Sequence, residues 1–252
     1  MLNNDMKNQL RFIIQSFHRN AQQQAHIGIG QLLSKYPDNP ELMQELAVIT
    51  FSFGINKLAL QFIKASFELE KTVDRLVMLA DLNFKLGNYS DAAIQFEEST
   101  KHLDDKNMYL RAANAYEKLD YYDQSISILK KGYKKYKDEN ILLYLINTYI
   151  LYGNIEEAKK SVKKFEKEFP NSKGKYSMLA FFNEVVLNDY EKAKEYYLKA
   201  AKSGDINAYY NIGSCCKNNE DYDEAEKYLK KLATFKNRDI IDYNYTLPLC
   251  FL

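Results

Sequence analysis

A small residue recurs at nearly constant spacing along this chain. The intervals between its successive positions are 34, 33, 33, 33, 35 and 32 residues. The positions are Ala25, Ala59, Ala92, Ser125, Ala158, Ala193 and Ala225. Most of them follow a turn residue and an acidic side chain, and precede a stretch with apolar residues at three- and four-residue spacing. A period of this length constrains the chain to an array of similar supersecondary units.

A second column of small residues lies twelve positions upstream of the first in most units. Its members are Ala47, Ala80, Ala113 and Gly213, with Ile13 and Ile146 as exceptions, and Ala180 joins it if one turn carries an extra residue. Two antiparallel helices can approach closely only where a side chain is small. The two columns therefore predict helix pairs. No stretch alternates convincingly with a period of two, so we predict an all-α fold.

The columns divide the chain into seven units and a tail. The units are expected to begin near residues 6, 40, 73, 106, 139, 173 and 206. Pro37 and Pro170 occupy the same place in their units, just after the second helix, where proline ends a helix without removing a bond. We expect one array over residues 1–237 and a tail over residues 238–252. The tail could pack back over the last helix pair, meet a partner, or mark the truncation of a longer array.

The repeated pattern resembles the tetratricopeptide repeat over about residues 6–237. It has a large apolar residue, Leu followed by Gly or Ala, then Tyr, Ala, Phe or Tyr, Ala and Pro. The match is strongest at ADLNFKLGNYSDAAIQFEES (80–99) and AYYNIGSCCKNNEDYDEAEKYLKKLA (208–233). Residues 190–213 also resemble the related Sel1-like variant. The resemblance implies a right-handed α-solenoid of about seven antiparallel helix pairs, with first helices lining a concave groove, and it implies partner binding.

In such helix pairs, positions two, five, nine and twelve of each unit face the groove. An Asn-Leu-Asn pattern that begins at Asn107 recurs 33 residues later at Asn140. A side-chain amide both donates and accepts hydrogen bonds, so successive asparagines can hold the main chain of an extended peptide. The alternative is that Asn is simply common here, with 22 in the chain. The candidate partner-binding residues are Asp81, Phe84, Asn107, Leu110, Arg111, Asn114, Lys118, Asn140, Leu143, Asn147 and Tyr210.

Two lysine-rich segments, residues 130–137 and 159–167, raise the alternative of nucleic-acid binding. Their lysines are spaced i, i+1, i+4, i+5 and acidic residues follow closely, which is typical of a solvated outer helix face. The whole chain has 35 Lys and Arg against 34 Asp and Glu, so its net charge gives no support to a polyanionic partner. We expect a non-enzymatic scaffold or adaptor that binds a protein or peptide. A self-assembling structural spacer is the alternative, an RNA-binding helical repeat is less favoured, and the oligomeric state stays open.

Residue patterns that indicate catalysis are absent from the sequence. His18, His26 and His102 are scattered, and there is no HExxH, GxSxG or glycine-rich phosphate motif. We therefore expect no enzymatic activity, no metal, no cofactor and no small-molecule substrate. The adjacent Cys215 and Cys216 are expected to pack inside the last unit as small apolar residues.

The cysteine content and the apolar runs predict the compartment. Three cysteines without a paired spacing fit a reducing environment better than a disulfide framework. The start of the chain lacks a basic stretch followed by an apolar one, as a signal peptide would have. The longest apolar run, residues 141–152, falls short of the roughly 20 residues that a spanning helix needs. We expect a cytoplasmic protein without a membrane span.

Overall fold

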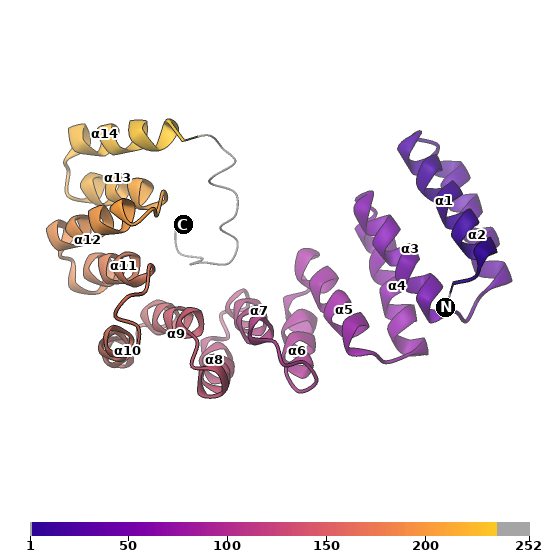
Figure 1. The fold of residues 1–252 in the computed structure, drawn as a ribbon, viewed down its shortest axis with the longest axis horizontal. Helices are drawn as coiled ribbons and strands as arrows, with labels where there is room; N and C mark the ends of the chain where they lie inside the picture. Colours follow the sequence, from indigo (N-terminus) through magenta and orange to yellow (C-terminus); the bar gives the residue numbers. More distant parts are fainter. Residues whose placement is uncertain (1, 236–252) are drawn as a thin grey trace. The chain divides into compact units, whose positions relative to one another are not determined.

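The structure is a computed structural model that describes residues 2–235. Over these residues it contains fourteen α-helices and no strand, which confirms the predicted all-α class (Figure 1). The chain divides into two compact units, the first ending at Tyr121 and the second beginning at Tyr122. The expected tail, residues 238–252, lies outside the described residues.

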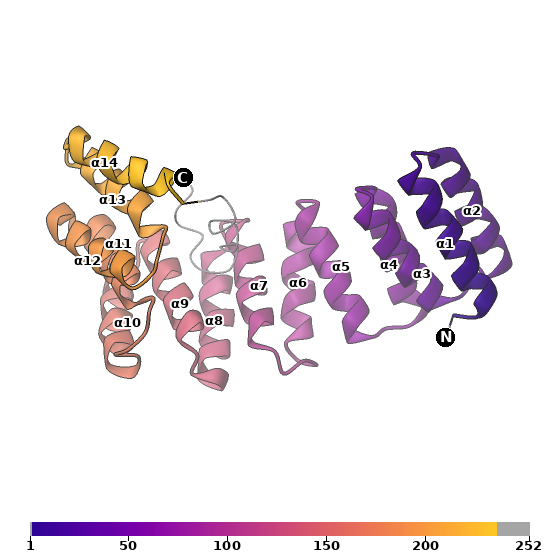
Figure 2. The ribbon, with the colours of Figure 1, turned by 45° about the horizontal axis from the view of Figure 1, so that its top comes forward.

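The first unit contains helices that pack in antiparallel succession (Figure 2). The pairs α3 with α4 and α5 with α6 make extensive contacts, and α4 packs on α5 and α6 on α7. The helices are α1 (Asn4–His18), α2 (Gln22–Lys35), α3 (Pro40–Ser52), α4 (Asn56–Leu69), α5 (Val73–Lys85), α6 (Tyr89–Ser99) and α7 (Lys106–Glu117).

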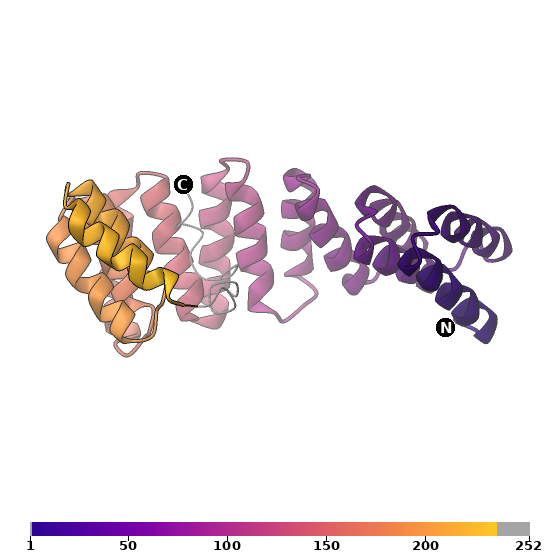
Figure 3. The same ribbon diagram turned by 90° about the horizontal axis from the view of Figure 1, so that it is seen from above.

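The second unit continues the same pattern. Helix α9 packs on α10, α11 on α12 and α13 on α14, and Figure 3 shows the last pair lying against each other. In Figure 1, α9, α11 and α13 follow one another on one side of this unit, with α10 and α12 on the other. The helices are α8 (Tyr122–Tyr136), α9 (Glu139–Leu151), α10 (Ile155–Glu168), α11 (Lys175–Leu187), α12 (Tyr190–Lys202), α13 (Ala208–Asn218) and α14 (Tyr222–Ala233).

The first column of small residues lies inside the helix packing. All seven of its members are buried. Gly213, from the second column, shows how close the approach is, because a Cβ built there would lie 2.8 Å from Cγ of Leu229. Small side chains are therefore a steric requirement of the helix pairs, as the sequence predicted.

The turn inside each helix pair contains one residue in the left-handed conformation. Each of these residues lies five positions before a member of the first column, so the turns recur at the same intervals as the small residues. Glycine or asparagine adopts this conformation at low cost. The residues are Asn20, Gly54, Gly87, Asp120, Gly153, Asn188 and Glu220, with φ values between 53° and 81°.

Candidate functional site

The predicted partner-binding residues divide between the two units. In the first unit, Asp81 and Phe84 belong to α5, and the helix α7 and its C-cap carry the rest of the set. The α7 residues are Asn107, Leu110, Arg111 and Asn114, and Lys118 is the C-cap. In the second unit, Asn140, Leu143 and Asn147 lie on α9, and Tyr210 lies on α13.

Within the first unit the structure brings Asp81 and Arg111 together. Nη2 of Arg111 lies 2.9 Å from Oδ1 of Asp81, and its guanidinium carbon lies 5.2 Å from the centroid of the Phe96 ring. Burial raises the pKa of the Asp81 carboxyl, and the charges of Arg111 and Lys85 oppose that shift. The sequence analysis named both residues as partner-binding candidates, and the structure pairs them with each other.

The other candidates of the first unit are less enclosed. The Phe84 ring is half-buried and lies 5.3 Å from the Tyr89 ring in an edge-on arrangement. Leu110 and Asn114 are half-buried, whereas Asn107 and Lys118 are exposed. The main-chain N–H of Asn107 donates to the carboxylate of Asp105, which caps α7. Each of these side chains is therefore at least partly exposed to solvent.

Asn147, on α9, is the most unusual of the predicted residues. Its side chain is only 2% exposed, and neither Nδ2 nor Oδ1 has a hydrogen-bond partner among the residues that the structure describes. Leu143 and Ile150 lie four residues before it and three after it, on the same face of the helix, and both are buried. We call Leu143, Asn147 and Ile150 the α9 row.

The structure distinguishes the two asparagines that the sequence treats as equivalent. Asn114 is half-buried, as a residue at a partially open surface is, but Asn147 is enclosed. The reason lies in α9, where nine of the ten residues from Ile141 to Ile150 are buried. Leu143 packs at the start of α11, because a Cβ built on Gly174 would lie 3.0 Å from its Cδ1.

An unpartnered buried amide has a definite energetic cost. Leaving a buried polar group unsatisfied costs roughly 1–3 kcal/mol relative to a satisfied one. Most buried side-chain polar atoms in native proteins are paired, so the unpaired amide of Asn147 is an exception that calls for an explanation. Asn140 lies at the start of α9, where its main-chain N–H donates to the Asp138 carboxylate at 2.9 Å. The remaining candidate of the second unit, Tyr210 on α13, is 44% exposed.

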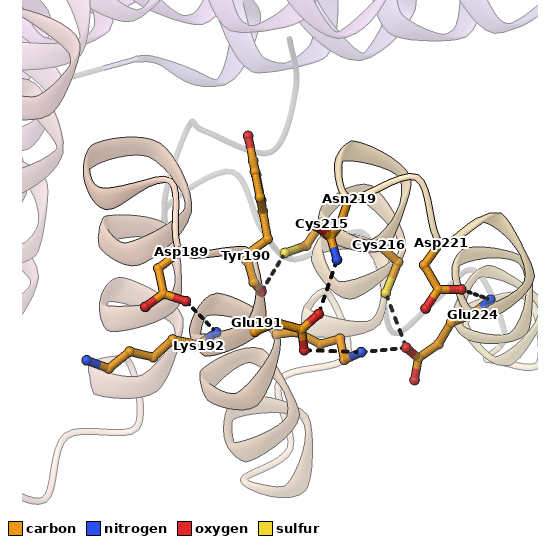
Figure 4. Close-up of polar contacts among 10 residues, drawn as sticks. Asp189, Tyr190, Glu191, Lys192, Cys215, Cys216, Asn219, Asp221 and Glu224 are labelled. Carbon is orange, nitrogen blue, oxygen red and sulfur yellow. Dashed lines mark hydrogen bonds and ion pairs between the residues drawn. The ribbon is translucent and has the colours of Figure 1, made fainter.

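A polar cluster joins α12, α13 and α14 (Figure 4). Nζ of Lys194 lies 2.5 Å from Oε2 of Glu224, and Nδ2 of Asn219 donates to Oε1 of Glu191 at 3.1 Å. The side chains leave no space for a water molecule between them. The cluster therefore fastens three helices together and offers no room for a ligand. The sequence analysis missed it, because Lys194 and Glu224 are 30 residues apart and each looks like an ordinary surface charge.

The two adjacent cysteines belong to this cluster and are buried on α13, where the sequence analysis placed them. Sγ of Cys215 donates to the carbonyl oxygen of Tyr190 at 3.2 Å. Burial raises the pKa of the Cys215 thiol to about 12 and also raises the pKa of Cys216. Both thiols are therefore protonated at neutral pH and are poor nucleophiles.

The lysine-rich segments lie on α10 and on α8 with the residue that follows it, and all of their lysines are exposed. Lys159 and Lys160 pair with Glu156 and Glu157 one turn earlier. Nζ of Lys164 lies 4.2 Å from the centroid of the Tyr133 ring. Nearby carboxylates and a tyrosine ring of the same chain therefore interact with several of these lysine side chains.

The described part of the chain contains neither a metal-binding cluster nor a helix that could span a membrane. Among residues 2–235, no group of three or more His, Cys, Asp or Glu side chains is arranged to hold a metal ion. No helix described there is both long enough and apolar enough to cross a bilayer.

Comparison with known families identifies the repeats. The tetratricopeptide repeat family matches residues 107–134, 187–203 and 206–239. The chain contains tetratricopeptide repeats. The segment 190–213 that resembles the Sel1-like variant lies almost wholly inside these matches. No curated protein matches the chain.

Solved structures of other proteins, two of them described as repeat proteins of this kind, share the fold. A tetratricopeptide repeat protein from Parabacteroides merdae is 16% identical, with 94% of this chain and 96% of that chain covered and a TM-score of 0.66. The C-terminal part of a repeat-containing protein from Cytophaga hutchinsonii is 19% identical, with 92% and 98% covered and a TM-score of 0.59. PilF of Pseudomonas aeruginosa is 12% identical, with 90% and 97% covered and a TM-score of 0.50. At these identities the likeness shows the fold.

Tetratricopeptide-repeat proteins bind protein partners and are generally not catalysts. The chain thus has the architecture of a protein-interaction scaffold.

Proposed function

We propose that this chain is a non-enzymatic scaffold or adaptor that holds an extended peptide segment of a protein partner against the α9 row. The buried, unpartnered amide of Asn147 is the observation that carries the proposal. The proposal treats residues 1–237 as one repeat array in the cytoplasm. Its support for that compartment is that Cys215 and Cys216 are free thiols.

An asparagine amide is suited to a peptide main chain because it can donate through Nδ2 and accept through Oδ1 at the same time. Both atoms of Asn147 lack a hydrogen-bond partner among the described residues, and both are buried. Such hydrogen bonds are made to the main chain of the peptide, so they do not depend on its sequence. Leu143 and Ile150, which are 8% and 6% exposed, flank the amide, so a peptide reaches it only when these buried side chains move aside and then meets apolar groups on both sides.

The remaining candidates extend this surface within their own units. Asn140 adds a half-buried amide near the start of α9, and Tyr210 adds an exposed ring on α13. In the first unit, Asn107, Leu110 and Asn114 form a second set on α7, with Lys118 at its end. Phe84 contributes apolar surface, and the paired Asp81 and Arg111 contribute polar contacts.

Selection from a random peptide library tests the proposal. Peptides selected on the wild-type protein should lose binding to Asn147→Leu, which keeps the volume of the side chain and removes its amide. The matched control is Asn8→Leu, because Asn8 is an exposed asparagine on α1. Peptides that bind wild type, Asn147→Leu and Asn8→Leu equally would contradict the proposal.

A self-assembling spacer is the second candidate function, and exposed aromatic rings favour it. The Tyr122 and Tyr152 rings stack 5.7 Å apart, and Tyr152 and Tyr222 are each about half or more exposed. Exposed apolar patches on a protein mark contact surfaces. Sedimentation of the purified protein separates the two functions, since a strict monomer at high concentration excludes the spacer.

A further inference from the structure

We infer that the outer surface formed by α8 and α10 binds the anionic headgroups of a lipid membrane. The inference goes beyond the proposed function and does not depend on it. It gives a role to the ten lysines of residues 130–137 and 159–167, which the peptide-binding proposal leaves unused. We call the surface that these lysines form the α8–α10 face.

Positive charge is concentrated on these two helices. Residues 122–137 and 155–168 contain ten lysines and five Asp or Glu, whereas the rest of the chain has 25 Lys and Arg against 29 Asp and Glu. The overall charge of +1 therefore conceals a face with a net charge of +5. A clustered charge acts on a partner within about a Debye length, roughly 8–10 Å, even when the whole molecule is nearly neutral.

A shared tyrosine ring joins the lysines of the two helices into one surface. Nζ of Lys137, the residue that follows α8, lies 5.1 Å from the centroid of the Tyr133 ring. Nζ of Lys164, on α10, lies 4.2 Å from the same centroid. Because both ammonium groups contact one ring, α8 and α10 present their lysines side by side.

A second contact between the helices lies near the start of α10. Glu157 accepts a hydrogen bond from Nζ of Lys160 at 2.6 Å. This bond lowers the pKa of the Glu157 carboxyl, and the charge of Lys130 on α8 lowers it further. All three side chains lie at the surface, where an ion pair contributes little to stability, so Lys160 can exchange its carboxylate for a lipid phosphate.

The composition of the α8–α10 face favours lipid headgroups over a protein partner. The centre of a protein–protein interface is rich in aromatic side chains and poor in lysine. None of the large apolar side chains that are exposed in the described chain lies on α8 or α10. The face therefore offers charge without the apolar anchors that carry most of the binding energy for a protein.

Two features also disfavour a nucleic acid. All cationic side chains of the face are lysines, and none is an arginine, whose planar guanidinium binds a phosphate or a guanine through two hydrogen bonds. The Tyr133 ring is buried and cannot stack on a base. A membrane requires neither feature, because the mean potential of anionic lipids attracts lysines without a fixed register.

The position of the face suits a planar surface. The lysines are spaced i, i+1, i+4 and i+5, so they lie together along each helix, whereas Ala158, Val162 and Phe165 form the buried side of α10. In Figure 1, α8 and α10 lie at the lower side of the second unit, with α9 above them. Contact with a membrane through this face leaves the α9 side of the unit directed toward the solution.

Co-sedimentation of the full-length protein with lipid vesicles tests the inference. The probes are vesicles of phosphatidylcholine alone and vesicles of phosphatidylcholine and phosphatidylserine in a ratio of about two to one. At about 0.1 M salt, the wild type should bind the anionic vesicles about tenfold more tightly than the neutral ones, or better. Raising the salt concentration should release the bound protein.

The decisive variant carries Lys134→Glu and Lys163→Glu, which reverse one exposed charge on each helix of the face. Its affinity for the anionic vesicles should fall about tenfold or more. The matched control carries Lys57→Glu and Lys64→Glu on α4, where both lysines are also exposed, and has the same net charge. Because the control leaves the face intact, it should bind within about twofold of the wild type. Circular dichroism checks that both variants are folded.

Three results would overturn the inference. The first is that the wild type binds anionic vesicles no better than neutral ones. The second is that both double variants lose binding equally, which would show that total charge matters and the α8–α10 face does not. The third is that a double-stranded oligonucleotide, compared at equal phosphate concentration, binds the wild type more tightly than the anionic vesicles do, which would assign the face to a nucleic acid.

Discussion

Gly213 of α13 and Leu229 of α14 are in such close contact that a single added carbon does not fit between them. A Cβ on Gly213 would lie 2.8 Å from Cγ and 2.9 Å from Cδ2 of Leu229, and 3.5 Å from the carbonyl oxygen of Ala225. This contact lies between the two helices of the last described pair.

We expect Gly213→Ala to destabilise the protein by about 1 kcal/mol or more, because overpacking a close contact outweighs the better helix propensity of alanine. Gly30→Ala is the matched control. Gly30 is also inside a helix, α2, but a Cβ there meets no atom within 4 Å. That variant should gain about 0.5–1 kcal/mol. Urea denaturation measures both, and a stabilised Gly213→Ala would disprove the steric account.

Glu220 provides a second prediction, because it has φ of 61° in the turn between α13 and α14. Glycine adopts this conformation without the steric penalty that a Cβ incurs, so Glu220→Gly should stabilise the protein by about 1 kcal/mol. The reverse exchange is Gly87→Ala, at φ of 81° in the turn between α5 and α6, which should be destabilising. Thermal denaturation of the two variants should show shifts of opposite sign.

Much of the fold could be predicted because its strongest requirements are local and steric. Ala92 and its equivalents are small because two helices meet there, and five residues earlier a left-handed turn requires a residue such as Gly87. Both requirements repeat with every helix pair. A single sequence therefore shows them several times, and the helix pairs follow from it.

The candidate site was less predictable because burial depends on neighbours that a repeat pattern does not specify. Asn114 and Asn147 occupy equivalent positions, but only Asn147 is enclosed. The pairs Asp81 with Arg111 and Lys194 with Glu224 are each 30 residues apart, and in sequence they cannot be told from solvated charges.

The thiols of Cys215 and Cys216 should resist alkylation in the folded protein. Burial raises the pKa of Cys215 to about 12 and raises that of Cys216, so the reactive thiolate is scarce at pH 7. The same protein treated with iodoacetamide after unfolding serves as the comparison, and mass spectrometry reads the modification of each cysteine. Modification of Cys215 or Cys216 before unfolding would contradict the burial seen here.

Glu184 leads to a pH prediction. Burial raises the pKa of its carboxyl above the ordinary 4.5, against the opposing effect of hydrogen bonds from Tyr197 and Asn218. A raised folded-state pKa means that the folded protein binds the proton more tightly than the unfolded chain. This group's contribution is therefore most favourable below pH 4.5 and is lost as the pH rises through the folded-state pKa.

The variant Glu184→Gln removes that titration. Relative to it, the wild type should gain unfolding free energy as the pH is lowered from 7 to 5. Urea denaturation at the two pH values measures the difference. A gap between wild type and variant that is the same at both would show that Glu184 does not titrate in this range.

Asn147 should be a residue at which stability and binding conflict. Asn147→Leu replaces two unsatisfied polar atoms with a side chain of similar volume that suits the apolar surroundings of α9, so the unfolding free energy should rise by about 1–3 kcal/mol. Asn8→Leu, at an exposed position, should change it by less than about 0.5 kcal/mol. Urea denaturation and peptide binding are measured on the same preparations. A more stable Asn147→Leu protein that has lost its peptides would mean that the amide is kept for recognition at a cost in stability. If the variant is instead less stable than wild type, the Asn147 amide is already satisfied within the folded chain and is not free to hold a peptide.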